Sequence, residues 1–197
     1  MKTILKSGYE KIMRLFYADK HAKFHLRNIS RQTKLNENSA SIFLNNLQKD
    51  QILNSIKEGN LKKYFLEKNS LTFGLLSLFD IERFNQLPII RKNATLYFLK
   101  ELNEQPIIVI LFGSTAKGDF VKNSDIDLFL VVNNKIKTKS AEDYAESQTG
   151  LRINCLQMTY SNFLKEIKLE EDKVMQSAIN SGYPLTNHLK YYSEVLQ

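Results

Sequence analysis

Two short apolar runs in the second half of the chain constrain its fold more than any other feature. Residues 107–112 read Ile-Ile-Val-Ile-Leu-Phe, and residues 128–132 read Leu-Phe-Leu-Val-Val. Apolar runs of this length, bounded by polar and turn-forming residues, are typical of strands that are buried on both faces. The two runs therefore predict neighbouring buried strands, and the polar residues between them lie where the two strands begin and end.

Those polar residues have a distinctive pattern. Gly113 and Ser114 directly follow the first run, and Asp125 and Asp127 stand at the start of the second. A glycine after a strand lets the backbone turn tightly towards an anion, and a serine hydroxyl with helix N-terminal N–H groups can hold a phosphate. Aspartates two apart in a strand point to the same side, and Mg²⁺ relieves their repulsion because it prefers oxygen ligands. A lone Asp-x-Asp is usually a turn or cap, but this one lies beside a Gly-Ser turn.

Gly-Ser, ten residues and Asp-x-Asp together resemble the signature of the polymerase-beta-like nucleotidyltransferase superfamily, and of its short, antitoxin-type minimal nucleotidyltransferases. The resemblance runs from about residue 90 to the C-terminus and implies an α+β domain over residues 89–197, with a mixed sheet flanked by helices. It implies an Mg²⁺-dependent enzyme of the EC 2.7.7 type that uses an NTP. In that reading Asp125 and Asp127 are the catalytic and Mg²⁺-binding residues, and the nucleotide is bound by Gly113, Ser114, Lys117 and Ser124.

One position departs from the family pattern. Catalytic members usually carry a third carboxylate on the next strand, predicted here at 151–158, where Asn154 stands instead. An amide cannot accept a proton near neutral pH and is a weaker metal ligand than a carboxylate. Acidic residues 142, 143 and 146 on the preceding helix have no spacing that suggests a replacement. Two alternatives stay open: a transferase, or a domain that only binds nucleotide.

The basic charge of the chain lies in its first third. Residues 1–70 hold 14 Lys and Arg against 6 Asp and Glu, a net charge of +8, whereas residues 71–197 hold 14 against 15, a net charge of −1. Such asymmetry is typical of a nucleic-acid-binding module joined to a different domain. Solvated lysines from a biased genome are the alternative explanation.

The first third also has a recognisable order of predicted elements. Helices are expected over about 8–17, 27–34 and from the turn at 35–39 to 50, with an extended stretch at 24–26 and a hairpin over 52–66. This order resembles a winged helix-turn-helix DNA-binding domain, assigned to residues 1–69. In such proteins the third helix enters the major groove and the hairpin lies on the backbone. The outward face of that helix would be Asn38, Ser39, Ser41, Ile42 and Asn45, and phosphates would be neutralised by Lys49, Lys57, Lys62 and Lys63. A winged helix used for protein contacts remains the alternative.

Residues 70–88 are predicted as a helical connector that ends at Pro88, and the following helix is expected to turn Leu96, Phe98 and Leu99 inward. One cysteine and three histidines argue against a disulfide framework or a zinc site. The chain has neither a signal-peptide pattern nor an apolar run long enough to span a bilayer, so we expect a cytoplasmic protein with no membrane contact.

A winged helix joined to a minimal nucleotidyltransferase resembles antitoxin-related proteins. That resemblance implies transfer of AMP from ATP to a hydroxyl, such as a tyrosine of a HEPN-type helical protein partner. Because winged helices often pair, a homodimer is also expected. The other hypothesis is a DNA-binding transcriptional regulator whose nucleotidyltransferase domain, changed at Asn154, only binds nucleotide.

Overall fold

The computed structural model describes residues 7–196, which form two compact units. The first comprises residues up to Phe79 together with Leu196, and the second comprises Asp80–Val195, so the boundary falls inside helix α4 (Ser70–Gln86). The first six residues of the predicted domain 1–69, and the last residue of the predicted domain 89–197, lie outside the described part.

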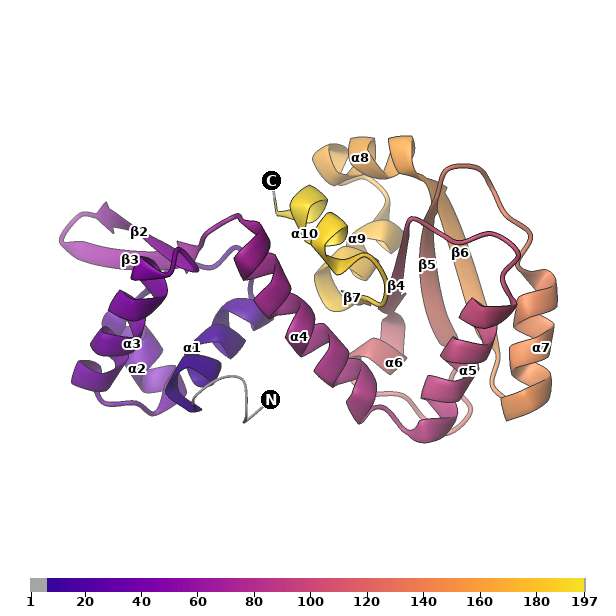
Figure 1. Ribbon diagram of the computed structural model, residues 1–197, viewed down its shortest axis with the longest axis horizontal. Helices are drawn as coiled ribbons and strands as arrows, with labels where there is room; N and C mark the ends of the chain where they lie inside the picture. Colours follow the sequence, from indigo (N-terminus) through magenta and orange to yellow (C-terminus); the bar gives the residue numbers. More distant parts are fainter. Residues whose placement is uncertain (1–6, 197) are drawn as a thin grey trace. The chain divides into compact units, whose positions relative to one another are not determined.

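Before α4, the N-terminal unit consists of three helices and a small antiparallel sheet with the strand order β1-β3-β2 (Figure 1). Its core is formed by apolar residues at helical spacing, including Ile12, Phe16, Ile29 and Leu44, each fully buried. The elements before α4 are α1 (Ser7–Ala18), β1 (Phe24–His25), α2 (Leu26–Thr33), α3 (Glu37–Lys49), β2 (Leu53–Glu58) and β3 (Leu61–Leu66).

Helix α3 begins earlier than the sequence pattern predicted. The turn before it is short, because Asn36 is the N-cap and its side chain accepts a hydrogen bond from the backbone N–H of Ser39 at 2.8 Å. An asparagine at this position satisfies one of the free N–H groups of the first helical turn. Residues 37–39, predicted as part of the turn, are therefore helical.

The second unit is built on a four-stranded sheet with the order β6-β5-β4-β7, in which only β5 and β6 are parallel. After α4, its elements are α5 (Ile89–Glu101), β4 (Ile108–Phe112), α6 (Gly113–Lys117), β5 (Ile126–Val132), α7 (Lys139–Thr149), β6 (Ile153–Thr159), α8 (Tyr160–Leu169), α9 (Lys173–Ser181), β7 (Tyr183–Pro184) and α10 (His188–Val195). The predicted mixture of helices with a mixed sheet is confirmed.

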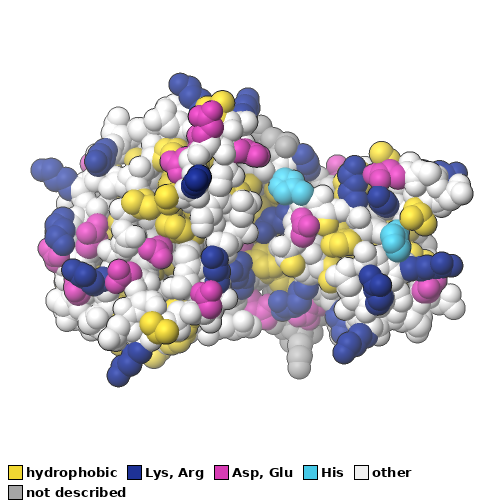
Figure 2. Space-filling view, turned by 180° about the vertical axis from the view of Figure 1, so that it is seen from behind, with side chains coloured by type: hydrophobic (Ala, Val, Ile, Leu, Met, Phe, Trp, Pro, Cys, Tyr) yellow, Lys and Arg dark blue, Asp and Glu magenta, His cyan; other side chains and the backbone are white. Residues whose placement is uncertain are grey.

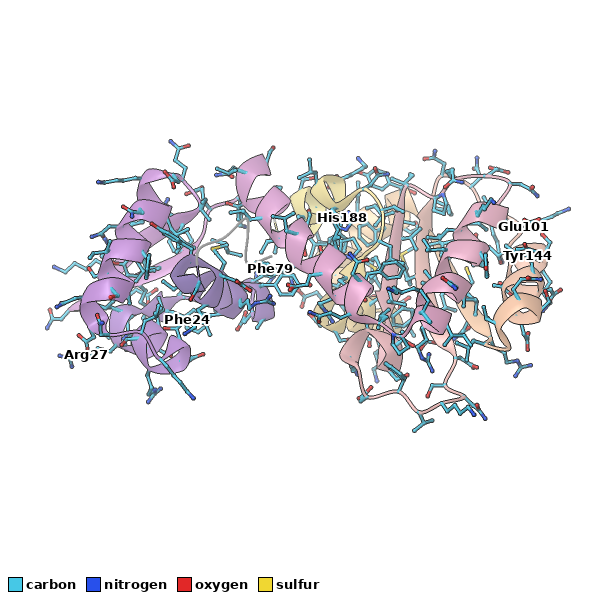
Figure 3. All side chains as sticks on the ribbon, turned by 60° about the horizontal axis from the view of Figure 1, so that its bottom comes forward. Phe24, Arg27, Phe79, Glu101, Tyr144 and His188 are labelled. Atoms are coloured by element: carbon cyan, nitrogen blue, oxygen red, sulfur yellow. The ribbon has the colours of Figure 1, made fainter. Side chains whose placement is uncertain are left out.

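Helices cover both faces of this sheet. Helices α5 and α7 lie side by side on one face, and α8, α9 and α10 lie on the other (Figures 1 and 3). The ring centroids of Tyr97 on α5 and Tyr144 on α7 are 6.0 Å apart in an edge-to-face arrangement. Burial on both faces explains why β4 and β5 are continuous apolar runs rather than alternating ones.

The inward face of α5 was predicted incorrectly at one position. Leu96 is 50% exposed, whereas Phe98 is fully buried and Leu99 is half-buried. The buried stripe instead runs through Arg91, Ala94 and Thr95 to Phe98, at the i, i+3, i+4, i+7 spacing of one helix face. The prediction used only the large apolar residues to find the buried face of α5. That face also contains the polar residues Arg91 and Thr95, so the predicted face was rotated away from the true one.

Candidate functional site

The Gly-Ser turn and the second aspartate meet at the end of the β4–β5 pair. Phe112, the last residue of β4, is paired with Asp127 of β5. Gly113 follows with a φ of +67°, in the left-handed region that favours glycine. A Cβ at this position would overlap the Asp127 carboxylate, because Oδ2 lies directly against the glycine. Both the conformation and the close approach therefore require Gly113.

Asp125 is placed differently from the prediction that both aspartates lie in the strand. Strand β5 begins at Ile126, so Asp125 precedes it. The Asp125 side chain is exposed, and it makes no hydrogen bond or ion pair with any other residue of the described chain. Asp127 is half-buried in the strand. One carboxylate is thus held by the sheet and the other is open to solvent.

Asn154 lies beside Asp127, where the third carboxylate was expected. The parallel register of β5 and β6 pairs these two residues, and the Asn154 amide Nδ2 donates to Asp127 Oδ1 at 2.9 Å. Within residues 7–196, no group of three or more His, Cys, Asp and Glu side chains is arranged to hold a metal ion. The acidic residues of α7 therefore do not complete a three-carboxylate cluster with Asp125 and Asp127 among the described residues.

A buried arginine, which the sequence reasoning missed, holds the loop between α6 and β5. Arg91 is 2% exposed, and its guanidinium donates to the Thr115 hydroxyl at 2.8 Å and to the carbonyl oxygens of Val121 and Ser124 at 2.9 and 3.0 Å. It also lies 4.1 Å from the ring centroid of Phe120. Desolvation by burial lowers the pKa of Arg91. The signal that could have found it is a charged residue on the apolar stripe of α5.

The remaining predicted nucleotide-binding residues flank this loop. Ser114 lies in the first turn of α6 and is half-buried, and Lys117 is the exposed last residue of that helix. The Ser124 hydroxyl accepts a hydrogen bond from the backbone N–H of Val121 at 3.0 Å, so it already helps to shape the loop. A pocket of about 470 Å³ adjoins α6, and Lys117, Arg83 and Tyr183 are among the residues that line it.

The residues predicted to contact DNA are on the surface of the N-terminal unit. Asn38, Asn45 and Lys49 on α3 are exposed, and Ser39 and Ser41 on the same helix are half-buried. On the face seen in Figure 2, Lys and Arg side chains are scattered over the surface as separate groups. Arg27 at the start of α2 extends into solvent (Figure 3).

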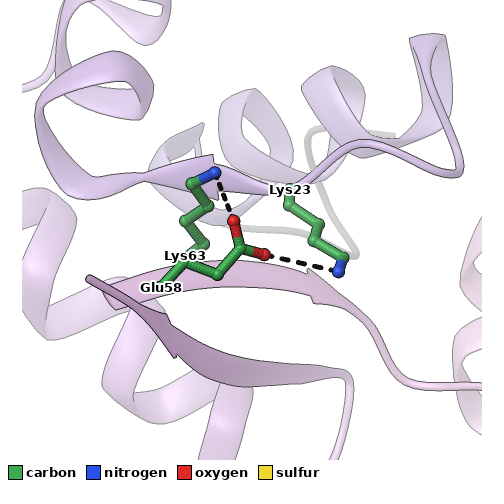
Figure 4. Close-up of polar contacts among 3 residues, drawn as sticks. All are labelled: Lys23, Glu58 and Lys63. Carbon is green, nitrogen blue, oxygen red and sulfur yellow. Dashed lines mark hydrogen bonds and ion pairs between the residues drawn. The ribbon is translucent and has the colours of Figure 1, made fainter. Parts of the chain in front are cut away.

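The predicted lysines of the hairpin differ in what surrounds them. Lys57 is exposed and forms no ion pair with another described residue. Lys62 donates to Gln48 Oε1 at 2.8 Å and lies 4.9 Å from the ring centroid of Tyr64. Lys63 donates to Glu58 Oε2 at 2.6 Å, and Lys23 donates to the other carboxylate oxygen at 3.4 Å (Figure 4). Two of the lysines therefore already have neighbours within the unit.

Comparison with known proteins agrees with the site geometry. Residues 93–181 match the family model described as "Nucleotidyltransferase domain". The match covers α5 to α9 and includes both aspartates and the Gly-Ser turn. This segment of the second unit is therefore similar to nucleotidyltransferase domains. The match covers less than half of the chain and does not include the N-terminal unit.

A solved structure, "Crystal structure of the toxin-antitoxin with AMP-PNP", is similar to part of the chain. The identity is 16%, the TM-score is 0.36, and the similarity covers 51% of this chain and 79% of the other. No curated protein matches the chain. No helix among residues 7–196 is both long enough and apolar enough to cross a bilayer.

Proposed function

We propose that this protein is an Mg²⁺-dependent nucleotidyltransferase that transfers a nucleoside monophosphate, AMP from ATP, to a hydroxyl. The observation that carries the proposal is the close approach of Gly113 and Asp127, which places a Gly-Ser turn against a carboxylate within a nucleotidyltransferase domain. Backbone N–H groups of the Gly113–Ser114 turn would hold the triphosphate, and Lys117 and Ser124 flank it.

The chemistry follows from the donor set. Carboxylate oxygens are the ligands that Mg²⁺ prefers, and Asp125 offers two oxygens with no internal partner while Asp127 Oδ2 points to Gly113. These two residues fit the ion, which would supply charge stabilisation at the phosphoryl oxygens. The acceptor hydroxyl oxygen forms a bond to the α-phosphorus, the bond to pyrophosphate breaks, and the hydroxyl proton passes to solvent water. Asn154 cannot take that proton, since an amide is not a base near neutral pH.

The N-terminal unit is proposed to be a winged helix-turn-helix that binds DNA. Its elements follow the order helix, strand, helix, helix and hairpin, and residues 1–70 carry a net charge of +8. Asn38, Ser39, Ser41 and Asn45 would face bases, and the lysines of α3 and the hairpin would neutralise phosphates. We propose a homodimer in the cytoplasm, with a HEPN-type helical protein as the acceptor, on the resemblance to antitoxin-related proteins.

A second candidate function is favoured by the Asn154–Asp127 hydrogen bond. The amide occupies Asp127 Oδ1 and leaves no carboxylate where a general base would stand. General-base catalysis typically contributes about 10²–10⁴-fold to a rate. A domain without it can still bind a nucleotide, and the protein would then be a DNA-binding regulator that senses NTPs.

Labelled ATP separates the two candidates. The full chain is incubated with α-labelled ATP, Mg²⁺ and a candidate helical partner, and label on the partner is measured beside ATP binding. Transfer by the wild type that is lost in Asp125→Ala supports the enzyme. ATP binding without transfer in the wild type overturns the enzyme proposal, and a gain of transfer in Asn154→Asp would then identify the missing acid as the cause. Asn134→Asp, outside the strands, is the matched control for an added carboxylate.

A further inference from the structure

One stripe of helix α3 presents an apolar side chain between polar ones. Asn38, Ile42, Asn45 and Lys49 follow the i, i+4, i+7, i+11 spacing of a single helix face, and all four are exposed. Ile42 is 60% exposed, the largest exposure of any apolar side chain in α3. Most of the Ile42 side chain therefore lies outside the core, where a ligand of the unit can reach it.

The polar members of this stripe are free to bind. No side-chain hydrogen bond joins Asn38 or Asn45 to any other residue within 7–196. Other amides of the same helix are occupied, since Asn46 donates to the Tyr9 hydroxyl at 2.7 Å and Gln48 donates to the Ser55 hydroxyl at 2.9 Å. The side-chain amides of Asn46 and Gln48 are thus hydrogen-bonded within the unit, whereas those of Asn38 and Asn45, beside Ile42, have no partner among the described residues.

Ile42 is also separate from the apolar residues of the hairpin. Residues paired across β2 and β3 share a face, and neighbours along a strand alternate. Ser55 contacts Gln48 of α3, so the Ser55 side chain lies on the side of the hairpin that faces α3. Lys57, two residues further along the strand, lies on the same side, and Ile56 lies on the opposite side. Ile42 is therefore separate from Ile56, and its neighbours on the α3 stripe are two asparagines and Lys49. This polar composition fits a DNA-binding face better than an apolar protein interface.

We infer that Ile42 reads the C5-methyl group of thymine, with Asn38 and Asn45 reading adenines on either side of it. This inference rests on the proposed DNA binding. Adenine offers N6 and N7 to an asparagine side chain, and thymine is the base that places a methyl group in the major groove. From Asn38 to Asn45 the helix advances ~10 Å, about three base-pair steps of ~3.4 Å. Between Asn38 and Asn45 the stripe carries no arginine or lysine to bind guanine, so these three positions select A·T pairs.

The test removes one methyl group from the DNA and one side chain from the protein. Duplexes bound by the full chain are selected from a random-sequence pool, and the selected duplex is then made with deoxyuridine at each thymine in turn. Fluorescence anisotropy is expected to show about fourfold weaker binding at a contacted position, the factor that corresponds to ~0.8 kcal/mol for a buried methyl group. Ile42→Ala should bind the thymine and deoxyuridine duplexes equally.

Ile56→Ala is the matched control, because Ile56 is also exposed and lies on the opposite side of the hairpin. It should discriminate between thymine and deoxyuridine as the wild type does. Ile42→Val should keep part of the discrimination, and thermal unfolding followed by circular dichroism checks that each variant is folded.

The outcomes separate this inference from the proposal beneath it. Salt-dependent binding to DNA with no effect of deoxyuridine at any position, or selection of G·C-rich or random duplexes, overturns the role of Ile42 and leaves DNA binding intact. Absence of binding to every duplex at low salt overturns DNA binding and, with it, the role of Ile42.

Discussion

The Asp127 site and the exposed stripe of α3 hold their polar groups in opposite ways. Asp127 is hydrogen-bonded by Asn154, and the adjoining loop is fixed by the buried Arg91. Asn38 and Asn45 have no such support among the described residues. The first arrangement is organised by contacts within the unit, including those of the buried Arg91, whereas the second would gain its contacts only on binding the proposed DNA. Substitutions at the first should therefore disturb folding, and substitutions at the second should change affinity alone.

The largest effect is expected from Arg91→Met. This change removes the three hydrogen bonds of a buried cation. The Thr115 hydroxyl and the Ser124 carbonyl oxygen lose the guanidinium as donor, whereas the Val121 carbonyl oxygen still accepts from the backbone N–H of Ser124. We expect the free energy of unfolding to fall by about 3 kcal/mol, because unsatisfied buried polar groups cost ~1–3 kcal/mol each and part of that cost is relieved by water. Urea unfolding measures the change. Lys92→Met is the control, since the Lys92 ammonium makes an exposed hydrogen bond to the carbonyl oxygen of Asn85; equal losses in both variants would contradict a special role for Arg91.

A smaller loss of stability is expected from Gly113→Ala. The substitution forces an alanine into a left-handed conformation and drives its Cβ into Asp127. Gly150→Ala is a matched control, because Gly150 has a similar φ of +69° and open space around it. We expect about 1 kcal/mol for Gly150→Ala and ~2 kcal/mol for Gly113→Ala, with ATP binding lost only in the latter. ATP binding retained in Gly113→Ala would separate this glycine from the nucleotide site.

Lys57→Gln should weaken DNA binding without affecting the fold. Lys57 is exposed on the side of the hairpin towards α3, so it is available to a phosphate. The slope of log affinity against log salt should decrease by ~0.9, the value for one phosphate contact on duplex DNA. Anisotropy titrations at several salt concentrations provide the slope. Lys68→Gln, beyond the hairpin, is the control, and identical slopes for the two variants would argue against phosphate contact through the hairpin.

The smallest effect is expected at Glu58. Its hydrogen bond with Lys63, together with the charges of Lys63 and Lys23, lowers the pKa of the Glu58 carboxyl. A carboxyl whose pKa is lower in the folded state contributes stability above its unfolded pKa and loses it as the pH falls through the folded pKa. The unfolding midpoint of the wild type should therefore drop slightly more than that of Glu58→Gln over this acidic range. Parallel profiles would mean that the ion pairs of Figure 4 contribute nothing measurable.

The parts of the molecule that could be predicted from the sequence are those determined by residues close together in the chain. Gly113, Ser114 and Asp127 lie within fifteen residues, and the turn they form needs a glycine for local reasons. The strands β4 and β5 were predicted because burial on both faces makes them continuously apolar. The family resemblance predicted that Asn154 lies beside the aspartates, and the register of β5 and β6 pairs it with Asp127.

What sequence reasoning missed depends on contacts between distant segments. Arg91 bonds residues 24 to 33 positions away, and a charged side chain on a helix is ordinarily assumed to face solvent. The same assumption led to the incorrect prediction that Leu96 faces the core. The partners of Lys62 and Lys63 required the hairpin register and the position of Gln48, which no local pattern reveals. The early start of α3 followed from an N-cap asparagine that was treated as part of a longer turn.

The strand order of the second unit has a consequence for synthesis on the ribosome. Strand β4 is flanked by β5, which follows it closely, and by β7, in which Pro184 pairs with Ile110 from 74 residues further along the chain. Until residues 183 and 184 have emerged, β4 presents an unpaired edge of an apolar strand, the kind of surface that other nascent chains can pair with. The N-terminal unit closes its sheet by residue 66. While residues 113–184 are being added, the nascent polypeptide therefore carries a closed N-terminal sheet and an incomplete second sheet.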